Sequence, residues 1–187
     1  MFKVKILETE EEKKELYATR YKIFVEQEKS VPAENYKDGL LKDHSDDHAY
    51  QIGCYEGSLL VGFMTLIVKK DDELLEVEQT HNLKPQANEK YAEVMRLVVL
   101  ETSFTKTISM KGKVMNLLFD TVKDIIISEN ITHLLLQSRE KSKKMYEKIG
   151  FKQIGDYKLY REKSYQCPMK LDVMKVSEKV VNISEFI

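Results

Sequence analysis

The amino-acid sequence predicts a single α/β domain, and three observations support this prediction. Strand-like and helix-like segments follow one another in the order β, α, loop, β, β, β, α, β, α, β, β. The 187 residues are enough to bury one hydrophobic core but few for two independent cores. The sequence contains neither an internal repeat nor a low-complexity linker. We therefore expect one domain over residues 1–187, with its core in residues 1–174 and an uncertain extension over 175–187.

The N-terminal half is predicted to contain a strand, a helix and a hairpin. Thr9 and Glu12 have the spacing of a capping box, and apolar residues follow at helical intervals. Pro32 and Gly39 interrupt the next segment and favour a loop. The second hairpin strand is almost wholly apolar, which predicts a central position in the sheet. The predicted segments are a strand over 1–7, a helix over 10–28, a loop over 30–47 and strands over 48–56 and 58–69.

The C-terminal half is predicted to form a strand–helix–strand unit followed by a second helix. Ser138 can cap that helix, and Gly150 can end it in the left-handed conformation. Such a unit gathers helix N-termini at one edge of the sheet, where phosphate groups bind. The predicted segments are a polar connection over 70–90, a strand over 94–100, a helix over 115–128, a strand over 132–136, a helix over 139–149, a strand from Phe151 and a strand over 166–174.

Charge and composition exclude several classes of partner. The chain has 30 basic and 31 acidic residues, so no net field favours nucleic acid or an anionic membrane. Its longest apolar stretch, residues 59–68, is about half of what a bilayer span requires. The N-terminus lacks the apolar region of a secretory signal, so we expect a cytoplasmic protein. Cys54 and Cys167 are expected to be reduced and partly buried, although a pairing between them stays open.

The segment from Ser138 to Phe151, with its Tyr146-x-x-x-Gly150-Phe151 pattern, resembles the fourth motif of the GNAT acyltransferase superfamily. The resemblance implies a three-layer fold, in which a central mixed sheet is flanked by helices and the fourth and fifth strands splay apart. The donor's pantetheine arm would lie in that gap, against the main chain of Leu97, Val98, Val99 and Leu100. Tyr146 would donate a proton to the departing thiolate. An amphipathic helix with a glycine cap and a core Phe explains the same residues without catalysis.

The segment between Leu100 and Met115 departs from the superfamily's pyrophosphate loop, because it is longer and holds a single glycine. Backbone N–H groups at a helix start, with Lys106, Lys111, Gly112 and Lys113, are the candidates for holding phosphates. A solvated, lysine-bearing loop is the competing interpretation. The departure leaves both an acyl-CoA and an acyl-carrier-protein thioester open as the donor.

Four short motifs in order resemble the GNAT branch of acyl-homoserine-lactone synthases and N-acyl amino acid synthases. The resemblance implies roles in binding substrate for Arg20, Phe24, Asp43, Asp46 and Arg96. The motifs are Arg20-x-x-x-Phe24, Asp43-x-x-Asp46, Gly62-x-x-x-Leu66 and Glu93-x-x-Arg96.

The charged residues of these motifs also have physical requirements of their own. Arg20 falls on the apolar face of the first helix, where an unpaired guanidinium would be costly, so it needs a carboxylate from Asp43, Asp46 or Glu93. Such an ion pair can be structural or can contact substrate. Glu93 starts the fourth strand and is the leading candidate for a general base that deprotonates the acceptor amine. Arg96 shares its face of the strand only if a bulge breaks the pleat.

Two departures separate this chain from the lactone-forming enzymes. Thr65 stands where those enzymes carry an Arg, and the chain has no Trp. Both differences fall around the S-adenosylmethionine side of the pocket, so the acceptor is expected to be an amino acid or another small-molecule amine. The alternatives are an ordinary acetyl-CoA-dependent acetyltransferase and a non-catalytic domain that binds acyl thioesters. Oligomeric state is left open.

The cluster of Asp and His over residues 43–48 holds metal-ligand residue types in a turn-rich segment. Consecutive residues in a turn give poor control of coordination geometry, so a solvated acidic loop is the favoured interpretation and no metal is expected.

Overall fold

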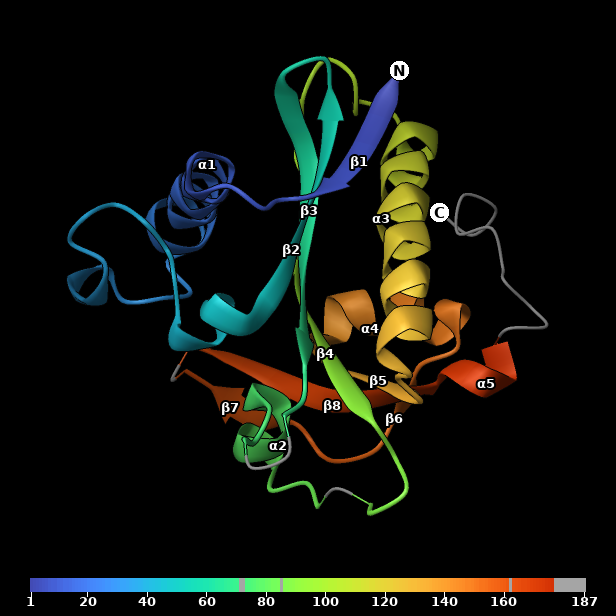
Figure 1. The fold of residues 1–187 in the computed structure, drawn as a ribbon. Helices are drawn as coiled ribbons and strands as arrows, with labels where there is room; N and C mark the ends of the chain where they lie inside the picture. Colours follow the sequence, from blue (N-terminus) through green and yellow to red (C-terminus); the bar gives the residue numbers. More distant parts are fainter. Residues whose placement is uncertain (71–72, 85, 162, 177–187) are drawn as a thin grey trace.

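The computed structural model describes residues 1–70, 73–84, 86–161 and 163–176 (Figure 1). Its strands are β1 (Phe2–Ile6), β2 (Ala49–Glu56), β3 (Leu59–Val68), β4 (Tyr91–Val99), β5 (His133–Ser138), β6 (Lys152–Gln153), β7 (Lys158–Tyr160) and β8 (Ser164–Asp172). Its helices are α1 (Glu10–Arg20), the π-helix η1 (Tyr21–Gln27), the 3₁₀ turns η2 (Ala33–Asn35) and η3 (His44–His48), α2 (Glu76–His81), α3 (Ile108–Glu129), α4 (Glu140–Ile149) and α5 (Val173–Val176).

The sheet is mixed, and the strand order β1-β2-β3-β4-β5-β8-β6 leaves β7 paired with β8 off that path. Neighbouring strands are antiparallel except β4 and β5, which run parallel because α3 connects them. The predicted hairpin of β2 and β3 and the predicted strand–helix–strand unit are both confirmed. β3 is buried over nearly its whole length, as its apolar sequence predicts for a central strand.

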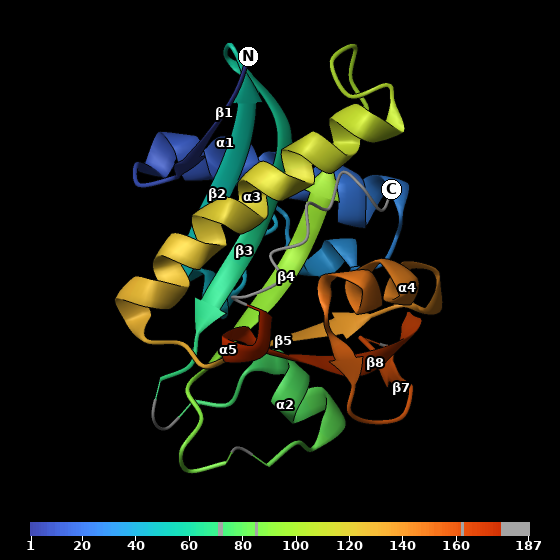
Figure 2. The same ribbon diagram turned by 90° about the vertical axis from the view of Figure 1, so that its right-hand side faces the viewer.

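Helices cover both faces of the sheet and give the predicted three layers. The continuous helix of α1 and η1 packs Leu16 and Phe24 against Phe63 of β3 on one face. α3 crosses the opposite face with Leu118 and Val122 in the main core, and Figure 2 shows it running diagonally over the first strands. Met145 and Ile149 of α4 join the α3 side of the core. α2 lies on the α1 side, near the start of β4.

Several predicted helix boundaries agree with the structure. Thr9 and Glu12 form the expected capping box of α1, and the helix predicted over 10–28 is α1 continued by η1. Gly150 ends α4 with φ +114°, as a left-handed C-terminal glycine should. Ser138, in contrast, is the last residue of β5, and Arg139 occupies the N-terminal cap position of α4.

Three elements differ from the sequence-based prediction. α3 begins at Ile108, seven residues before the predicted start, because Thr107 caps it by accepting a hydrogen bond from the N–H of Met110. α2 occupies part of the predicted polar connection. Residues 173 and 174, predicted as strand, belong to α5. The uncertain extension is described only to residue 176, and the rest of it lies outside the described residues.

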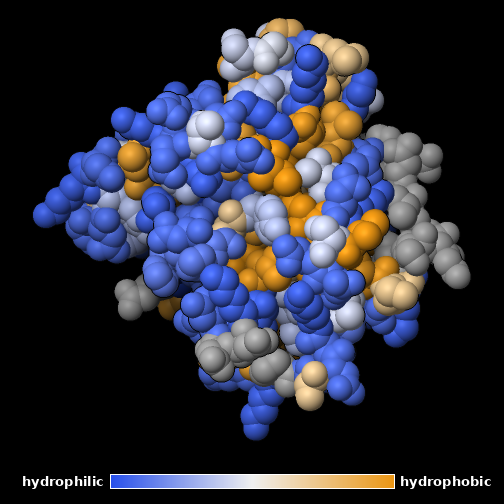
Figure 3. Space-filling model, viewed as in Figure 1, coloured by the Kyte–Doolittle hydropathy of each residue, from blue (hydrophilic) through white to orange (hydrophobic). Residues whose placement is uncertain are grey.

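The face seen in Figure 3 carries apolar residues in a band down its middle, with hydrophilic residues over α1 beside it. Among the helices that the structure describes, none combines the length and apolarity needed to cross a lipid bilayer.

The strands β4 and β5 pair only where they begin and then separate. Tyr91, Ala92 and Glu93 pair with His133, Leu134 and Leu135, whereas the second half of β4 pairs on its other side with β3. β5 continues along β8 instead. The expected splay is therefore present, and it opens a gap in the sheet directly after Glu93.

Gly62 of β3 offers a test of how closely α3 packs on the sheet. A Cβ atom at this position would lie 2.6 Å from Cγ1 of Val114 and 3.1 Å from the carbonyl oxygen of Val98. We expect Gly62→Ala to lower the free energy of unfolding by about 1–3 kcal/mol through overpacking. Val114→Ala in the same chain should recover part of that loss, so the double variant is more stable than the sum of the single effects, measured by urea unfolding. Simple additivity would contradict the packing argument.

Candidate active site

A cleft of about 390 Å³ fills the gap between β4 and β5. Residues 93–99 of β4 form one wall, and the ends of β5 and α4 form the other. The N-terminal helix and the segment after it cover the cleft with Phe24, Ser30, Val31 and Leu41. The predicted site residues Glu93, Arg96, Leu97, Val98, Val99 and Tyr146 all line it.

A β-bulge at Arg96 decides which side chains share this cleft. The pairing of β3 with β4 shifts between Phe63 and Thr65, which oppose Val98 and Met95, so β4 holds one extra residue there. Arg96 has φ +52°, a left-handed conformation that is uncommon for a residue with a side chain. The bulge turns Arg96 onto the face of the sheet that Glu93 occupies, which is the condition that the odd spacing of the two residues required.

Arg20 lies at the centre of a buried polar network. Its side chain is 0% exposed, and Nη1 donates to Oδ1 of Asp46 at 2.9 Å. Nη2 donates to Gln51 and to Thr65. Burial and the neighbouring Arg96 lower the pKa of Arg20 to about 10. This value is still high enough for Arg20 to be charged near neutral pH. The carboxylate that Arg20 was expected to need is therefore that of Asp46.

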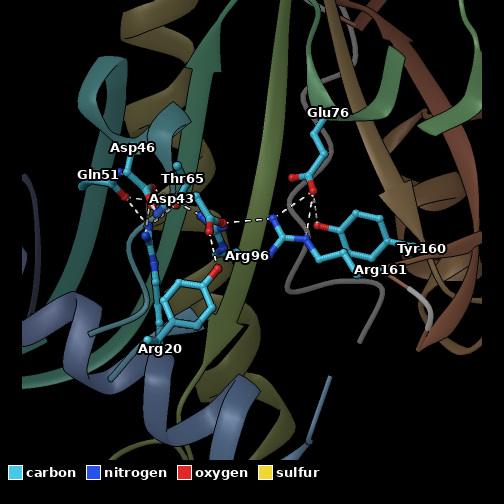
Figure 4. Close-up of polar contacts among 10 residues, drawn as sticks. Arg20, Asp43, Asp46, Gln51, Thr65, Glu76, Arg96, Tyr160 and Arg161 are labelled. Atoms are coloured by element: carbon cyan, nitrogen blue, oxygen red, sulfur yellow. Dashed lines mark hydrogen bonds and ion pairs between the residues drawn. The ribbon is translucent and has the colours of Figure 1, made fainter. Parts of the chain in front are cut away.

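The network continues from Asp46 through Arg96 and Asp43 to Arg161 (Figure 4). Nη1 of Arg96 lies 3.3 Å from Asp46, and Nη2 pairs with Asp43. Arg161, which follows β7, donates to Asp43 at 3.0 Å. Burial raises the pKa of Asp43, but Arg96 and Arg161 outweigh it and hold that pKa below its ordinary value. Arg20 and Asp46 thus stand behind the cleft wall and support Arg96 rather than lining the cleft themselves.

Sequence reasoning missed Arg161 and its partner Glu76. Nε of Arg161 donates to Oε1 of Glu76 at 2.9 Å, and the hydroxyl of Tyr160 donates to the same oxygen at 2.8 Å. Arg161 and Tyr160 both line the cleft. No local pattern marks either residue in the sequence, because α2 and the turn after β7 meet only in the folded chain.

Glu93 is a buried carboxyl group at the point where the two strands separate. It is 1% exposed, and the backbone N–H of Val77 lies 3.1 and 3.2 Å from its two oxygens. Burial, followed by the negative charge of Glu76, raises the pKa of Glu93 to about 8. Hydrogen bonds from the backbone of α2 and from Gln137 oppose this rise. A carboxylate with such a pKa can accept a proton from an ammonium group near neutral pH.

Tyr146 reaches the cleft from α4, on the other side of the gap. Its ring packs edge-on against Phe151, with the ring centres 5.8 Å apart. Burial raises the pKa of Tyr146 to about 12, so its hydroxyl keeps its proton at neutral pH and is able to donate it. Glu93 and Tyr146 thus offer a proton acceptor and a proton donor on opposite walls.

The candidate phosphate-binding residues lie around the start of α3. Lys111, Gly112 and Lys113 lie in the first two turns of α3, so the helix begins before them rather than after them. Lys111 is 3.8 Å from Glu101, Gly112 is buried, and Lys106 and Lys113 are exposed. These four residues and Leu100 lie outside the lining of the cleft. The prediction assumed that the helix starts after Val114, whereas Thr107 starts it earlier.

The Asp and His cluster of residues 43–48 forms the turn η3, with Asp43 and Asp46 directed into the ion-pair network. Among the residues that the structure describes, no group of three or more acidic, His or Cys side chains is arranged to hold a metal ion. Cys54 and Cys167 are buried free thiols.

Solved structures with the same architecture place the chain in a class. FeeM, an N-acyl amino acid synthase from uncultured soil microbes, has a TM-score of 0.74 and 18% identity, covering 100% of this chain and 97% of that one. BjaI, a CoA-dependent acyl-homoserine lactone synthase solved with isopentyl-CoA, has a TM-score of 0.64 and 17% identity over 86% and 75%. Escherichia coli ElaA has a TM-score of 0.60 and 17% identity over 92% and 100%. The splayed sheet and its flanking helices define the GNAT-type acyltransferase fold.

A protein-family model described as N-acyl amino acid synthase FeeM matches residues 15–172, which is most of the chain. A search of the curated proteins finds no match to this sequence. The chain belongs to the FeeM family of N-acyl amino acid synthases and is an acyltransferase. The predicted branch of the superfamily is therefore confirmed.

The ion-pair network predicts unequal effects at two neighbouring aspartates. Asp46→Asn leaves Arg20 and Arg96 buried without that carboxylate, so we expect the free energy of unfolding to fall by about 3–5 kcal/mol. Asp47→Asn removes an exposed pairing with Lys42 and should change little. Urea unfolding of both variants measures the difference. Equal stabilities would show that the network does not hold the fold.

Proposed function

We propose that the protein transfers an acyl group from a thioester to the amino group of an amino acid. The observation that carries the proposal is the juxtaposition of Glu93 with two guanidinium groups, those of Arg96 and Arg161, on the lining of one cleft. A base is needed for the ammonium group of the acceptor, and guanidinium groups are the preferred partners of a carboxylate. An amino acid presents both groups. Membership of the FeeM family supports the same acceptor class.

The donor is proposed to lie along the part of β4 that does not pair with β5. Residues 97–99 line the cleft, and Val98 and Val99 pair with β3 on their other side, which leaves main-chain groups facing the gap for the amides of a pantetheine arm. The cleft does not extend to the lysines near the start of α3. Both acyl-CoA and an acyl-carrier protein carry this arm, so either can serve as the donor.

The proposed reaction needs one proton acceptor and one proton donor. Glu93 takes a proton from the acceptor's ammonium group, and the free amine attacks the thioester carbonyl carbon. The tetrahedral intermediate loses a second proton from its nitrogen to solvent and collapses as the carbon–sulfur bond breaks, and Tyr146 donates its proton to the leaving thiolate, so one proton is released overall. The products are an N-acyl amino acid and a thiol. Protons then pass from Glu93 to solvent and from solvent to Tyr146.

The acceptor and donor are small metabolites or carriers that an intracellular enzyme meets, and we place the reaction in the cytoplasm. The two buried free cysteines support this placement, since reduced thiols are typical of that compartment.

Glu93→Gln tests the role of the base. Glutamine keeps an oxygen to accept from Val77 but cannot take a proton, so we expect turnover to fall by about 100- to 10,000-fold. In the unaltered protein kcat/KM should rise with pH through about 8, where Glu93 is half ionised, and level off at higher pH as its ionisation is completed. Glu34→Gln, an exposed glutamate outside the cleft, is the matched control. N-acyl amino acid formation is followed by mass spectrometry with acyl-CoA and acyl-carrier-protein donors. If the unaltered protein binds a donor but forms no product, the protein is a non-catalytic sensor.

Arg161→Met tests whether the acceptor carries a carboxylate. The KM for an amino acid should rise by roughly 10- to 100-fold, because a charge-assisted hydrogen bond is lost. The KM for the corresponding amine without a carboxylate should stay the same. This comparison within one variant separates carboxylate recognition from any disturbance of Glu76 and Asp43. An equal rise for both acceptors would contradict the assignment.

A further inference from the structure

The side chain of Gln137 connects the candidate base to a histidine outside the cleft. Gln137 lies on β5, two residues beyond Leu135, the partner of Glu93 in the parallel register, and therefore on the same face of the sheet. It lines the cleft beside Glu93. Its Oε1 lies 3.1 Å from Nε2 of His81, the last residue of α2. Neither residue belongs to the motifs that the sequence reveals.

The surroundings of His81 fix which ring nitrogen carries the proton. His81 is 7% exposed, and burial lowers its pKa, so the ring is neutral with one N–H near neutral pH. Nδ1 is buried and has no partner with hydrogen-bond geometry among the described residues. The backbone of Asp156 is the weakest of the influences on this ring, after burial, Gln137 and Lys158. A proton on Nε2 forms a hydrogen bond to Gln137 at 3.1 Å, whereas a proton on Nδ1 would have only the weaker influence of the Asp156 backbone.

With its oxygen directed at His81, the Gln137 amide turns its N–H groups toward other partners. The carboxyl group of Glu93 lines the same cleft, and a hydrogen bond from Gln137 favours its ionised form. The order His81, Gln137, Glu93 therefore runs from donor to acceptor without a conflict.

We propose that His81 and Gln137 form a positioning relay, in which His81 turns the Gln137 amide toward Glu93 and Gln137 stabilises the proton-accepting carboxylate. The relay rests on the proposed function in taking Glu93 as the base, and its two members act through Glu93 without touching the reacting atoms. It gives the buried carboxylate a side-chain donor in addition to the backbone N–H of Val77.

The other charged groups around the relay are already paired and stay constant in the test. They are Glu76 with Arg161, Glu78 with Lys69, and Arg96 with Asp43, while Lys158 acts on His81 from β7. A change in the titration of Glu93 in a relay variant therefore reports the lost hydrogen bond.

Titration of Glu93 by carbon-13 NMR of its side-chain carboxyl group, assigned with Glu93→Gln, tests the relay directly. Gln137→Met removes the donor at nearly constant volume and should raise the pKa of Glu93 by on the order of one unit. His81→Phe should raise it in the same direction. The double variant should match Gln137→Met alone, because His81 acts through Gln137. Gln153→Met, an exposed glutamine on β6, is the matched control. Gln137→Leu is a second apolar replacement if the first fails to fold.

The same shift should appear in turnover, with the rising limb of kcat/KM moving to higher pH in Gln137→Met and the rate recovering at alkaline pH. The acceptor's ammonium group titrates identically in all variants, so the difference belongs to the protein. An unchanged Glu93 pKa in Gln137→Met, or additive shifts in the double variant, would overturn the relay. Full activity of Glu93→Gln would instead overturn the base itself, and the NMR titration distinguishes the two failures because it needs no turnover.

Discussion

The left-handed backbone at Arg96 is the constraint on which the site depends. The β-bulge formed there gives β4 one extra residue, so the side chains of Glu93 and Arg96 lie on the same face of the sheet. A positive φ at a residue with a side chain costs on the order of 1–3 kcal/mol and persists only where the surroundings enforce it. The ion pairs of Arg96 with Asp43 and Asp46 supply that enforcement. Without the bulge, Arg96 would point to the α3 side and the cleft would lose one of its cations.

The ion pairs of Arg96 belong to a larger set of buried and partly buried charges around the cleft. Arg20, Arg96 and Arg161 face Asp43, Asp46 and Glu76, so three positive and three negative groups form one chain across the gap in the sheet. Each ion is costly to desolvate, and the balance holds only because each has a partner at short range. This series of ion pairs connects α1 and η3 to α2 and to the turn after β7, which are far apart in the sequence. We infer that these ion pairs hold the two walls of the cleft in a fixed position relative to each other.

The parts of the fold and the site that depend on local sequence patterns were predictable from the sequence. The Tyr146-x-x-x-Gly150-Phe151 segment and the β2–β3 hairpin are marked by local periodicity and turn residues. Arg20 is recognisable because it is a charged residue on an apolar helix face. α2 was not predictable, because Glu76–His81 is short and polar and is held in place by Glu93 and other residues from distant strands. The early start of α3 was hidden by Gly112 and the lysines around it. Arg161 and Gln137 matter only through contacts between distant segments, which periodicity does not reveal.

The buried network accounts for the departure at Thr65. Its hydroxyl accepts from Arg20 and donates to Gln51 at 3.1 Å, and its side chain is 0% exposed. A second arginine at this position would place another guanidinium against Arg20, where Asp46 is already shared with Arg96. The extra charge would require another carboxylate or a different course for the segment of residues 30–47. With the small, neutral Thr65 at this position, Arg20 stays in the buried network and supports Arg96 through Asp46. Arg96 and Arg161 are then the arginines of the network that face the cleft.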